Sequence, residues 1–428
     1  MTRLSAWLVF LAVVALGVMM FMLFRQPPPP TTAAIDAAPP AENRPVLNYV
    51  PQAVGLPVQD HPVIAHVAIC DLDGDGLPDI LVCDATANRV EWIRQFPRGV
   101  YTESPLGDPI PGPAHVSVAD INQDGKPDLL VASMGVILPN NDRIGQVVIL
   151  ENLGDGRFRN HVVAENIPRV TDVRAADFRG TGHLDLLVGQ YGYNDGEIRW
   201  MENLGDWNFR SHVLLQKPGT IMTPVADFDR DGKPDFAAIL GQDTVQEVHV
   251  FRNLGNGEFQ DKLLWMTSNE HWGGSGLAVS DLNGDGLPDL IYSNGDGFDT
   301  GFYGPAPWHG LQWLENRGDG NFIYHRIGDS PGCYSPIAVD LNGDGRPDIV
   351  TVSTFNKAND TASVWMTAWL NDGQGHFTTV PLAHSPSHFI TVAAGDLDGN
   401  GVPVLVTGGF FAYPPFTDLN RVTLWRRQ

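Results

Sequence analysis

DLDGDGLPD, at residues 71–79, is the phrase that decides the fold, because related phrases recur along the whole chain. The other copies are DINQDGKPD (120–128), DFRGTGHLD (177–185), DFDRDGKPD (227–235), DLNGDGLPD (281–289), DLNGDGRPD (340–348) and DLDGNGVPV (396–404). Their first residues are 49 to 59 positions apart, and a period of about this size is typical of solenoids, propellers and other repeat arrays. Seven such units account for residues 46–428 of the 428-residue chain.

Each unit contains short apolar runs bounded by turn residues. In the first unit HVAIC (66–70) precedes the phrase and ILVC (80–83) follows it. A second phrase comes later in the units, such as VVILENLGDGRF (147–158), a β-rich run that enters a turn and leaves it through a phenylalanine. These runs predict four strands per unit, and no helical period is present outside the N-terminal region. We therefore predict an all-β fold, a seven-bladed β-propeller of four-stranded blades.

The two ends of the repeat region fit a closed ring. The last unit stops at VTLWRRQ (422–428), which corresponds to the third strand of a blade. LNYVPQAVGL (47–56) precedes the first unit without belonging to it. We expect residues 47–56 to complete the seventh blade and so to cover strand edges that would otherwise invite aggregation.

The N-terminal region has a different composition. Residues 4–24, LSAWLVFLAVVALGVMMFMLF, carry no charge and lie between Arg3 and Arg25. About 20 apolar residues span the hydrocarbon core of a bilayer. We interpret residues 1–25 as one N-terminal transmembrane helix that anchors the chain, with a cleaved signal peptide as the alternative. Residues 26–45 are rich in Pro and Ala and predict an extended tether, so that residues 46–428 form the propeller.

Charge and cysteine content exclude several classes of protein. The 50 acidic against 27 basic side chains give a net charge of -23, which would repel a phosphate backbone and argues against nucleic acid as a partner. The three cysteines, Cys70, Cys83 and Cys333, form no CxxC motif, so a disulfide scaffold, a zinc ribbon and c-type haem are disfavoured. Cys70 and Cys83 could pair across one hairpin, but we favour buried free thiols.

The spacing of the acidic residues within the phrase predicts calcium binding. Asp71, Asp73 and Asp75 alternate around a tight loop, Gly76 permits the turn and Asp79 closes the site, which supplies the hard oxygen ligands that Ca²⁺ prefers. A solvated acidic turn is the alternative reading of one copy, but intact copies recur. We predict about five calcium sites, with the ligands Asp71, Asp73, Asp75, Asp79, Asp120, Asn122, Asp124, Asp128, Asp227, Asp229, Asp231, Asp235, Asp281, Asn283, Asp285, Asp289, Asp340, Asn342, Asp344 and Asp348.

Two copies depart from this pattern. DFRGTGHLD places Arg179 and Thr181 where carboxylates belong, and we expect the guanidinium to replace the ion there. DLDGNGVPV ends in Val404 and lacks the closing carboxylate, which predicts a weak or empty site. Calcium modules of this affinity class suit the millimolar calcium outside the cytoplasm. We therefore expect the propeller to face the periplasm or the cell exterior.

The phrases resemble the FG-GAP and VCBS repeats of integrin α-subunit-like propellers, and the resemblance covers residues 46–428. The Phe-Gly and Gly-Ala-Pro signatures that name the family are absent, so the chain is similar to the bacterial VCBS-like branch. The resemblance implies the propeller fold and bound calcium. Members of that branch range from adhesion and scaffold proteins to polysaccharide-active enzymes, so it implies no single activity.

Specificity is expected at the end of the propeller opposite the acidic phrases, where the connections vary most. The connection SNGDGFDTGFYGPAPWHG carries Phe302 and the four residues that we propose as ligand-binding, Phe298, Tyr303, Trp308 and His309. Variable aromatic loops on a rigid scaffold are where binding specificity usually resides. The alternative is that these aromatic side chains only pack the loop.

A second candidate lies five residues before each acidic phrase, at the start of the innermost strand. His66, His115 and Asp172 come from successive units in one register, so they could converge at the central channel. Two histidines and a carboxylate can form a metal site or an acid–base set, which makes them the catalytic candidates. Polar residues lining a wet channel are the alternative. We favour a protein- or glycan-binding module over an enzyme such as a metal-assisted polysaccharide or sugar lyase.

Overall fold

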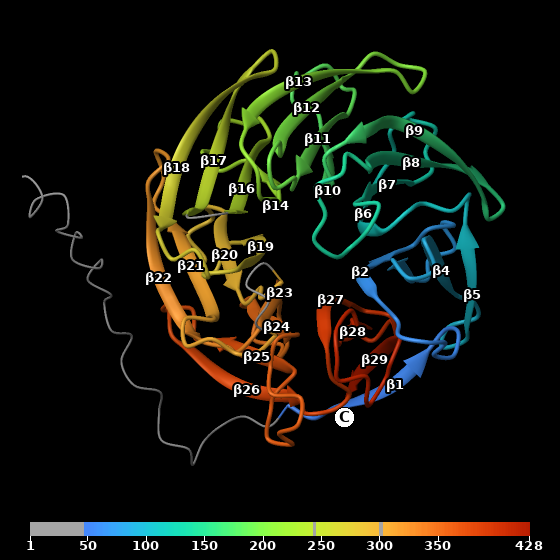
Figure 1. Ribbon diagram of the computed structural model, residues 1–428, viewed down its shortest axis with the longest axis vertical. Helices are drawn as coiled ribbons and strands as arrows, with labels where there is room; N and C mark the ends of the chain where they lie inside the picture. The colour runs from blue at the N-terminus through green and yellow to red at the C-terminus, as the bar shows by residue number, and fades with distance from the viewer. Residues whose placement is uncertain (1–46, 243–244, 299–302) are drawn as a thin grey trace, which may run out of the picture. The chain divides into compact units, whose positions relative to one another are not determined.

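The computed structural model describes residues 47–242, 245–298 and 303–428, all of which belong to one unit, Ala37–Gln428. These residues form seven antiparallel sheets arranged around a central channel (Figure 1). The predicted anchor (1–25) and tether (26–45) lie outside the described residues. Within the described ranges, no helix is long and apolar enough to cross a membrane.

Each blade takes its strands in chain order from the channel outward. Blades one to four contain β2 (Ile64–Cys70), β3 (Asp79–Asp84), β4 (Arg89–Gln95) and β5 (Tyr101–Leu106); β6 (Pro113–Ala119), β7 (Asp128–Ser133), β8 (Gly145–Gly154) and β9 (Arg157–Ile167); β10 (Val170–Ala176), β11 (Asp185–Gln190), β12 (Glu197–Asn203) and β13 (Phe209–Gln216); and β14 (Thr220–Met222), β15 (Val225–Ala226), β16 (Asp235–Gln242), β17 (Val245–Gly255) and β18 (Glu258–Thr267).

The remaining three blades follow the same order, except that the outermost strand of blade seven is β1. Blades five to seven contain β19 (Gly274–Ser280), β20 (Asp289–Asn294), β21 (Gly310–Asn316) and β22 (Phe322–Asp329); β23 (Cys333–Val339), β24 (Asp348–Ser353), β25 (Met366–Asn371) and β26 (Phe377–Ala383); and β27 (Phe389–Gly395), β28 (Val404–Gly409), β29 (Val422–Arg427) and β1 (Tyr49–Val54). The predicted seven-bladed propeller is confirmed.

Burial explains the composition of the strands. The second strand of a blade is covered on both faces by neighbouring blades, and every residue of β3, β7 and β20 is buried. Such strands are continuous apolar runs because neither face meets water. The outer strands have one face in solvent, and β9 accordingly alternates between exposed and half-buried residues along much of its length. The hydrophobic core therefore lies between blades, as in the cluster of Leu81, Val116 and Leu129 from blades one and two.

The ring is closed by the strand that precedes the first unit, as predicted. β1 pairs with β29 in antiparallel register, from Tyr49 opposite Arg427 to Val54 opposite Val422. The inner strands of neighbouring blades also contact each other around the whole channel, including β27 and β2 from the two ends of the chain. The outer edge of blade seven is thus supplied by the N-terminal side of the chain (Figure 1).

Blade four departs from the expected four strands. Its innermost strand is divided into β14 and β15, which both pair with β16. Pro224 lies between them and has no backbone N–H to donate to the ladder. The division frees the backbone N–H of Thr223, which instead donates to Asp172 of blade three at 2.8 Å.

The cysteines are free, as favoured, and Cys83 and Cys333 are buried as predicted, whereas Cys70 is half-buried. In the β2–β3 hairpin Cys70 pairs with Asp79 and Cys83 pairs with His66. The two thiols therefore lie at opposite ends of the hairpin, where no disulfide could join them.

Candidate functional site

The acidic loops connect the first and second strands of the blades, and they share one end of the propeller with the turns between the third and fourth strands; we name this the acidic end. In blade one, Asp71 organises the loop by accepting hydrogen bonds from the backbone N–H groups of Gly74 (2.8 Å), Asp75 (3.1 Å) and Gly76 (2.9 Å). Gly76 has φ +83°, which favours glycine. The same pattern recurs at Asp281 and Asp340.

The closing aspartate of each intact loop is buried beneath it. Asp79 accepts the N–H of Leu72 at 3.2 Å and the N–H of Gln95 at 2.8 Å, and its side chain is fully buried. Burial disfavours the charged carboxylate. It raises the pKa of Asp79, Asp128 and Asp235 to about 6 and that of Asp289 to about 7, although backbone donors act against it.

Carboxylates converge in two of the five intact loops. In the described part of the chain, oxygens of Asp71, Asp73 and Asp79 lie within 4.8 Å of one another, as do those of Asp227, Asp229 and Asp235. Oxygens that share one calcium ion, each about 2.3–2.6 Å from it, can be up to about 5 Å apart. Both groups therefore fit a calcium ion, and the other three loops carry Asn at the third position, an amide oxygen that calcium also accepts.

In several blades a charged residue on the third strand contacts the acidic loop of the same blade. In blade one Arg94 donates through Nε to Asp73 (2.6 Å) and through Nη2 to Asp75 (3.2 Å). In blade four Arg252 pairs with Asp229 and Asp231 in the same manner. Blade five instead has Glu315, which accepts from the Asn283 amide at 3.1 Å. An arginine thus faces the loops with Asp at the third position, whereas a glutamate faces the blade-five loop with Asn there.

In the two copies that depart from the phrase, an arginine also contacts a carboxylate of the loop. In blade three Arg179 contacts Asp185 at 2.9 and 3.0 Å and Glu202 at 3.0 Å, so a guanidinium lies on the closing carboxylate, as predicted. In blade seven Arg426 pairs with Asp398 at 2.9 Å. These third-strand residues were not predicted from the sequence. Arg252 and Glu315 precede the Asn of the ENLGDG-like phrases, but Arg94 precedes Gln95 and Arg426 precedes Arg427, so no single motif marks the position.

Asparagine side chains of the third strands connect four of the acidic loops to the next blade. The Asn152 amide of blade two donates to the carbonyl of Leu72 in blade one at 3.2 Å, and Asn316 of blade five donates to Phe228 of blade four at 2.8 Å. Asn253 and Asn371 make the equivalent bonds. A change in one loop therefore reaches the neighbouring blade directly.

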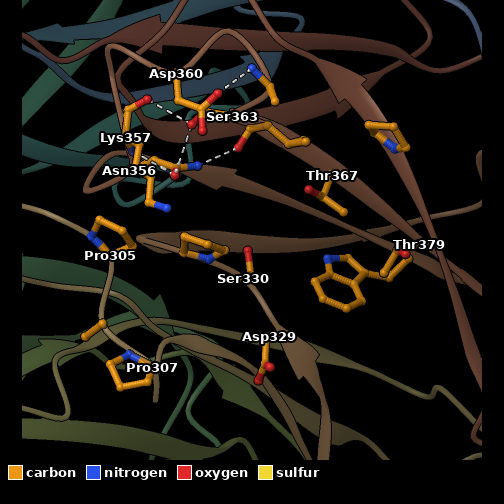
Figure 2. A pocket seen from close by; sticks show the side chains of 16 residues that line it. Pro305, Pro307, Asp329, Ser330, Asn356, Lys357, Asp360, Ser363, Thr367 and Thr379 are labelled. Carbon is orange, nitrogen blue, oxygen red and sulfur yellow. Dashed lines mark hydrogen bonds between the residues drawn. The ribbon is translucent and has the colours of Figure 1, made fainter. Parts of the chain in front are cut away.

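The opposite end of the propeller, the loop-rich end, carries the connections between second and third strands and between blades. A groove of about 720 Å³ lies there between blades five and six. Figure 2 shows Asn356, Lys357 and Asp360 of the blade-six connection on one side of it, and Pro307 and Asp329 of blade five on the other. Blade six was not predicted to contribute, although its connection also carries aromatic residues, Phe355 and Trp365.

The predicted ligand-binding residues fall into two groups. Phe298 and His309 pack against neighbouring segments: the Phe298 ring lies edge-on to Phe355 of blade six with ring centroids 4.9 Å apart, and His309 Nδ1 accepts the N–H of Gly332 at 3.1 Å. Tyr303 is 48% exposed. Trp308 donates its indole N–H to the carbonyl of His271 at 2.6 Å and lines a hollow of about 340 Å³ beside the groove. Phe302 lies outside the described residues.

The three catalytic candidates do converge at the channel. The rings of His66 and His115 are 4.1 Å apart, and His115 Nδ1 lies 3.1 Å from an oxygen of Asp172. Asp172 is fully buried and also contacts Arg174 Nε at 2.9 Å as well as Thr223. Its carboxylate is therefore neutralised by a guanidinium, which does not favour the metal-assisted enzyme. A catalytic role for these residues stays a prediction.

Comparisons with known proteins agree with this geometry. The model of the FG-GAP-like repeat matches residues 71–131, 177–238, 227–292 and 294–351, more than half of the chain. Cartilage acidic protein 1 of Xenopus tropicalis is 30% identical over 165 residues, which are 36% of this chain and 25% of that protein. The match thus spans about a quarter of that relative.

Solved structures with little sequence identity share the fold. Two crystal structures of BBS1N in complex with ARL6DN, soaked with mercury and with lead, have TM-scores of 0.51 and 0.52 at 11% and 10% identity. Each comparison covers 89% of this chain and 96% or 97% of the other. At this level of identity the likeness concerns the fold alone.

Proposed function

Because the chain belongs to the FG-GAP-like repeat family, we propose that it is a binding propeller, tethered to a membrane and stabilised by calcium, whose loop-rich end takes a protein or a glycan. Function in this fold resides in the loops that the rigid blades present. BBS1N, which shares the fold, was crystallised in complex with ARL6DN. That complex supports a partner-binding role without identifying the partner here.

The groove between blades five and six is the observation that carries the proposal. It joins exposed charged groups, Asp329, Lys357 and Asp360, with the neighbouring indole of Trp308. Aromatic anchors beside polar groups are typical of recognition surfaces. The indole N–H of Trp308 is held by the carbonyl of His271, so the ring is already oriented before a ligand arrives.

Calcium would be held by the intact loops of blades one, two, four, five and six, through the side-chain oxygens at the first, third, fifth and ninth positions of the phrase. Bound calcium would supply positive charge where buried and clustered carboxylates repel one another. The closing aspartates connect this charge to the core, since Asp79 also accepts the N–H of Gln95 on the third strand. In blades one and four a third-strand arginine contacts both the third and the fifth position of the loop, whereas in blades two and six Lys126 and Arg346 contact the fifth position alone. We therefore expect weaker calcium binding in blades one and four.

The location of the protein follows from the same proposal. Residues 1–25 would anchor the chain as a transmembrane helix, residues 26–45 would form the tether, and residues 46–428 would form the propeller. Calcium loops of this kind are filled at the millimolar calcium found outside the cytoplasm. We therefore propose that the propeller faces the periplasm or the cell exterior.

The experiment that tests the binding site uses a photo-crosslinking amino acid in the full-length chain, together with a glycan array. The probe is placed at Trp308 or, as a control aromatic position at the acidic end, at Trp207. We expect one defined crosslinked protein, or one glycan class, that depends on position 308 and is absent for position 207. Equal products from both positions, or none from either, would contradict the proposed site.

A further inference from the structure

A cavity of about 160 Å³ lies at the loop-rich mouth of the central channel, separate from the groove between blades five and six. All seven blades contribute to its wall, which is mainly apolar and includes Met134, Ile137, Met222, Ile390 and Phe410. A cavity of about 150 Å³ is large enough to admit one benzene ring. The size therefore matches a molecule with a single ring.

Two imidazoles, from His66 and His115, line this cavity side by side. His66 Nδ1 accepts the backbone N–H of Val116 at 3.4 Å, so the proton of the neutral ring lies on Nε2. His115 Nδ1 lies 3.1 Å from an Asp172 oxygen, and two lone pairs at that distance would repel, so the proton of His115 lies on Nδ1. The Nε2 atom of His66 is thus a donor, and that of His115 is an acceptor.

Neither imidazole carries a charge at neutral pH. Burial lowers the pKa of both rings well below the ordinary value, and the nearby Arg174 acts in the same direction. The charge of Asp172 is balanced by Arg174 at 2.9 Å. The side chain of His115 is only 4% exposed, and among the described residues of this cluster the buried atoms without a hydrogen-bond partner are its Nδ1 and the Asp172 oxygen 3.1 Å away. A neutral His115 ring that is protonated at Nδ1 leaves Nε2 as the acceptor that a ligand in the cavity can use.

We propose that the channel mouth binds a small neutral molecule with one apolar ring and one hydroxyl group, that is, a phenol or a cyclic alcohol. A hydroxyl both donates and accepts a hydrogen bond, so it can accept from His66 Nε2 and donate to His115 Nε2. The methionine and isoleucine side chains would surround the ring. This site is independent of the proposed partner surface and of the calcium loops.

The test compares phenol with toluene, which has similar size and no hydroxyl, by ligand-observed NMR titration of the full-length chain in calcium-containing buffer. We expect phenol to bind about tenfold more tightly than toluene, as one or two hydrogen bonds would require. His66→Phe, which removes the donor and keeps a ring, should abolish that difference and leave toluene affinity within about twofold. His376→Phe, an exposed histidine at the acidic end, serves as the matched control and should leave the phenol preference intact.

A second variant keeps the test decisive if His66→Phe does not fold. Ala114 also lines the cavity, and Ala114→Trp should fill it and remove binding of both probes, while the melting curve confirms folding. Equal affinities for phenol and toluene, or no binding of either, would overturn the proposal. Tetramethylammonium is the third probe, because Asp296 and Phe298 also line the cavity; tighter binding of this cation than of phenol would overturn the assignment to a neutral ligand.

Discussion

Arg252 should weaken calcium binding in the loop of blade four, and Arg252→Gln should strengthen it. Nη2 of Arg252 lies 3.5 Å from an oxygen of Asp231. A calcium ion on that oxygen, at about 2.4 Å from it, would be about 5 Å from the guanidinium. Because the Arg252 side chain is 49% exposed, we use the dielectric constant of water, and the repulsion is then about 1.7 kcal/mol. That free energy corresponds to roughly fifteen-fold in affinity.

The assay is the calcium content of the full-length protein after equilibrium dialysis against a series of free calcium concentrations, measured by atomic emission. At intermediate concentrations Arg252→Gln should hold up to about one more equivalent than the parent protein. Arg143→Gln is the matched control, because Arg143 is 50% exposed and pairs with Asp195 away from the acidic loops. Identical calcium content in all three proteins over the whole series would refute the reasoning.

The remaining predictions concern the edge strand, pH and the loop aromatics. A variant lacking residues 1–45 should keep the melting temperature of the propeller, whereas one lacking residues 1–58 loses β1 and should melt early or aggregate; equal melting temperatures would refute ring closure. In EDTA, the free energy of unfolding measured with urea should fall as pH rises from about 4 to 7. Burial raises the folded-state pKa of Asp79 to about 6 and of Asp289 to about 7, so the protonated carboxyl groups, which favour the folded state, are lost over this range. A urea midpoint that does not change with pH would contradict this. Trp308→Ala should reduce partner binding with little change in stability, and Phe298→Ala should cost about 2–3 kcal/mol of stability through lost packing against Phe355. If Trp308→Ala instead lowered stability and Phe298→Ala instead reduced binding, the assigned roles of the two residues would be wrong.

The repeat phrase predicted the fold because its residues determine the local backbone conformation of one loop and two strands. Alternating aspartates and a left-handed glycine specify a tight loop between two strands, and the apolar runs on either side specify buried strands. The divided inner strand of blade four was not predicted, although Pro224 marks it. The N–H of Thr223 that the division frees is accepted by Asp172 of another blade, and such contacts between units leave no periodic signal in the sequence.

The candidate sites were predictable to different extents. The predicted calcium ligands of each loop lie within nine consecutive residues, so that prediction needs only their spacing. The counter-charge of Arg94 comes from a strand outside the phrase, and it became evident only when β4 placed the guanidinium over Asp73. The groove between blades five and six combines connections from two units, with Lys357 and Pro307 on its opposite sides, so no single stretch of sequence contains it. The predicted proximity of His66 and His115 is confirmed, because equivalent positions of neighbouring inner strands lie next to each other at the channel.

Calcium dependence of the melting temperature tests the central claim most directly. At 1 mM calcium a loop with a dissociation constant of about 10⁻⁴ M adds about 1.4 kcal/mol. Three such loops, with smaller contributions from blades one and four, add about 4–5 kcal/mol, which is a large part of the stability of a domain. Full-length protein should therefore melt at a much lower temperature in EDTA than in 1 mM calcium, and readdition of calcium should restore the curve. Superimposable melting curves in EDTA and in calcium would contradict a calcium-stabilised propeller.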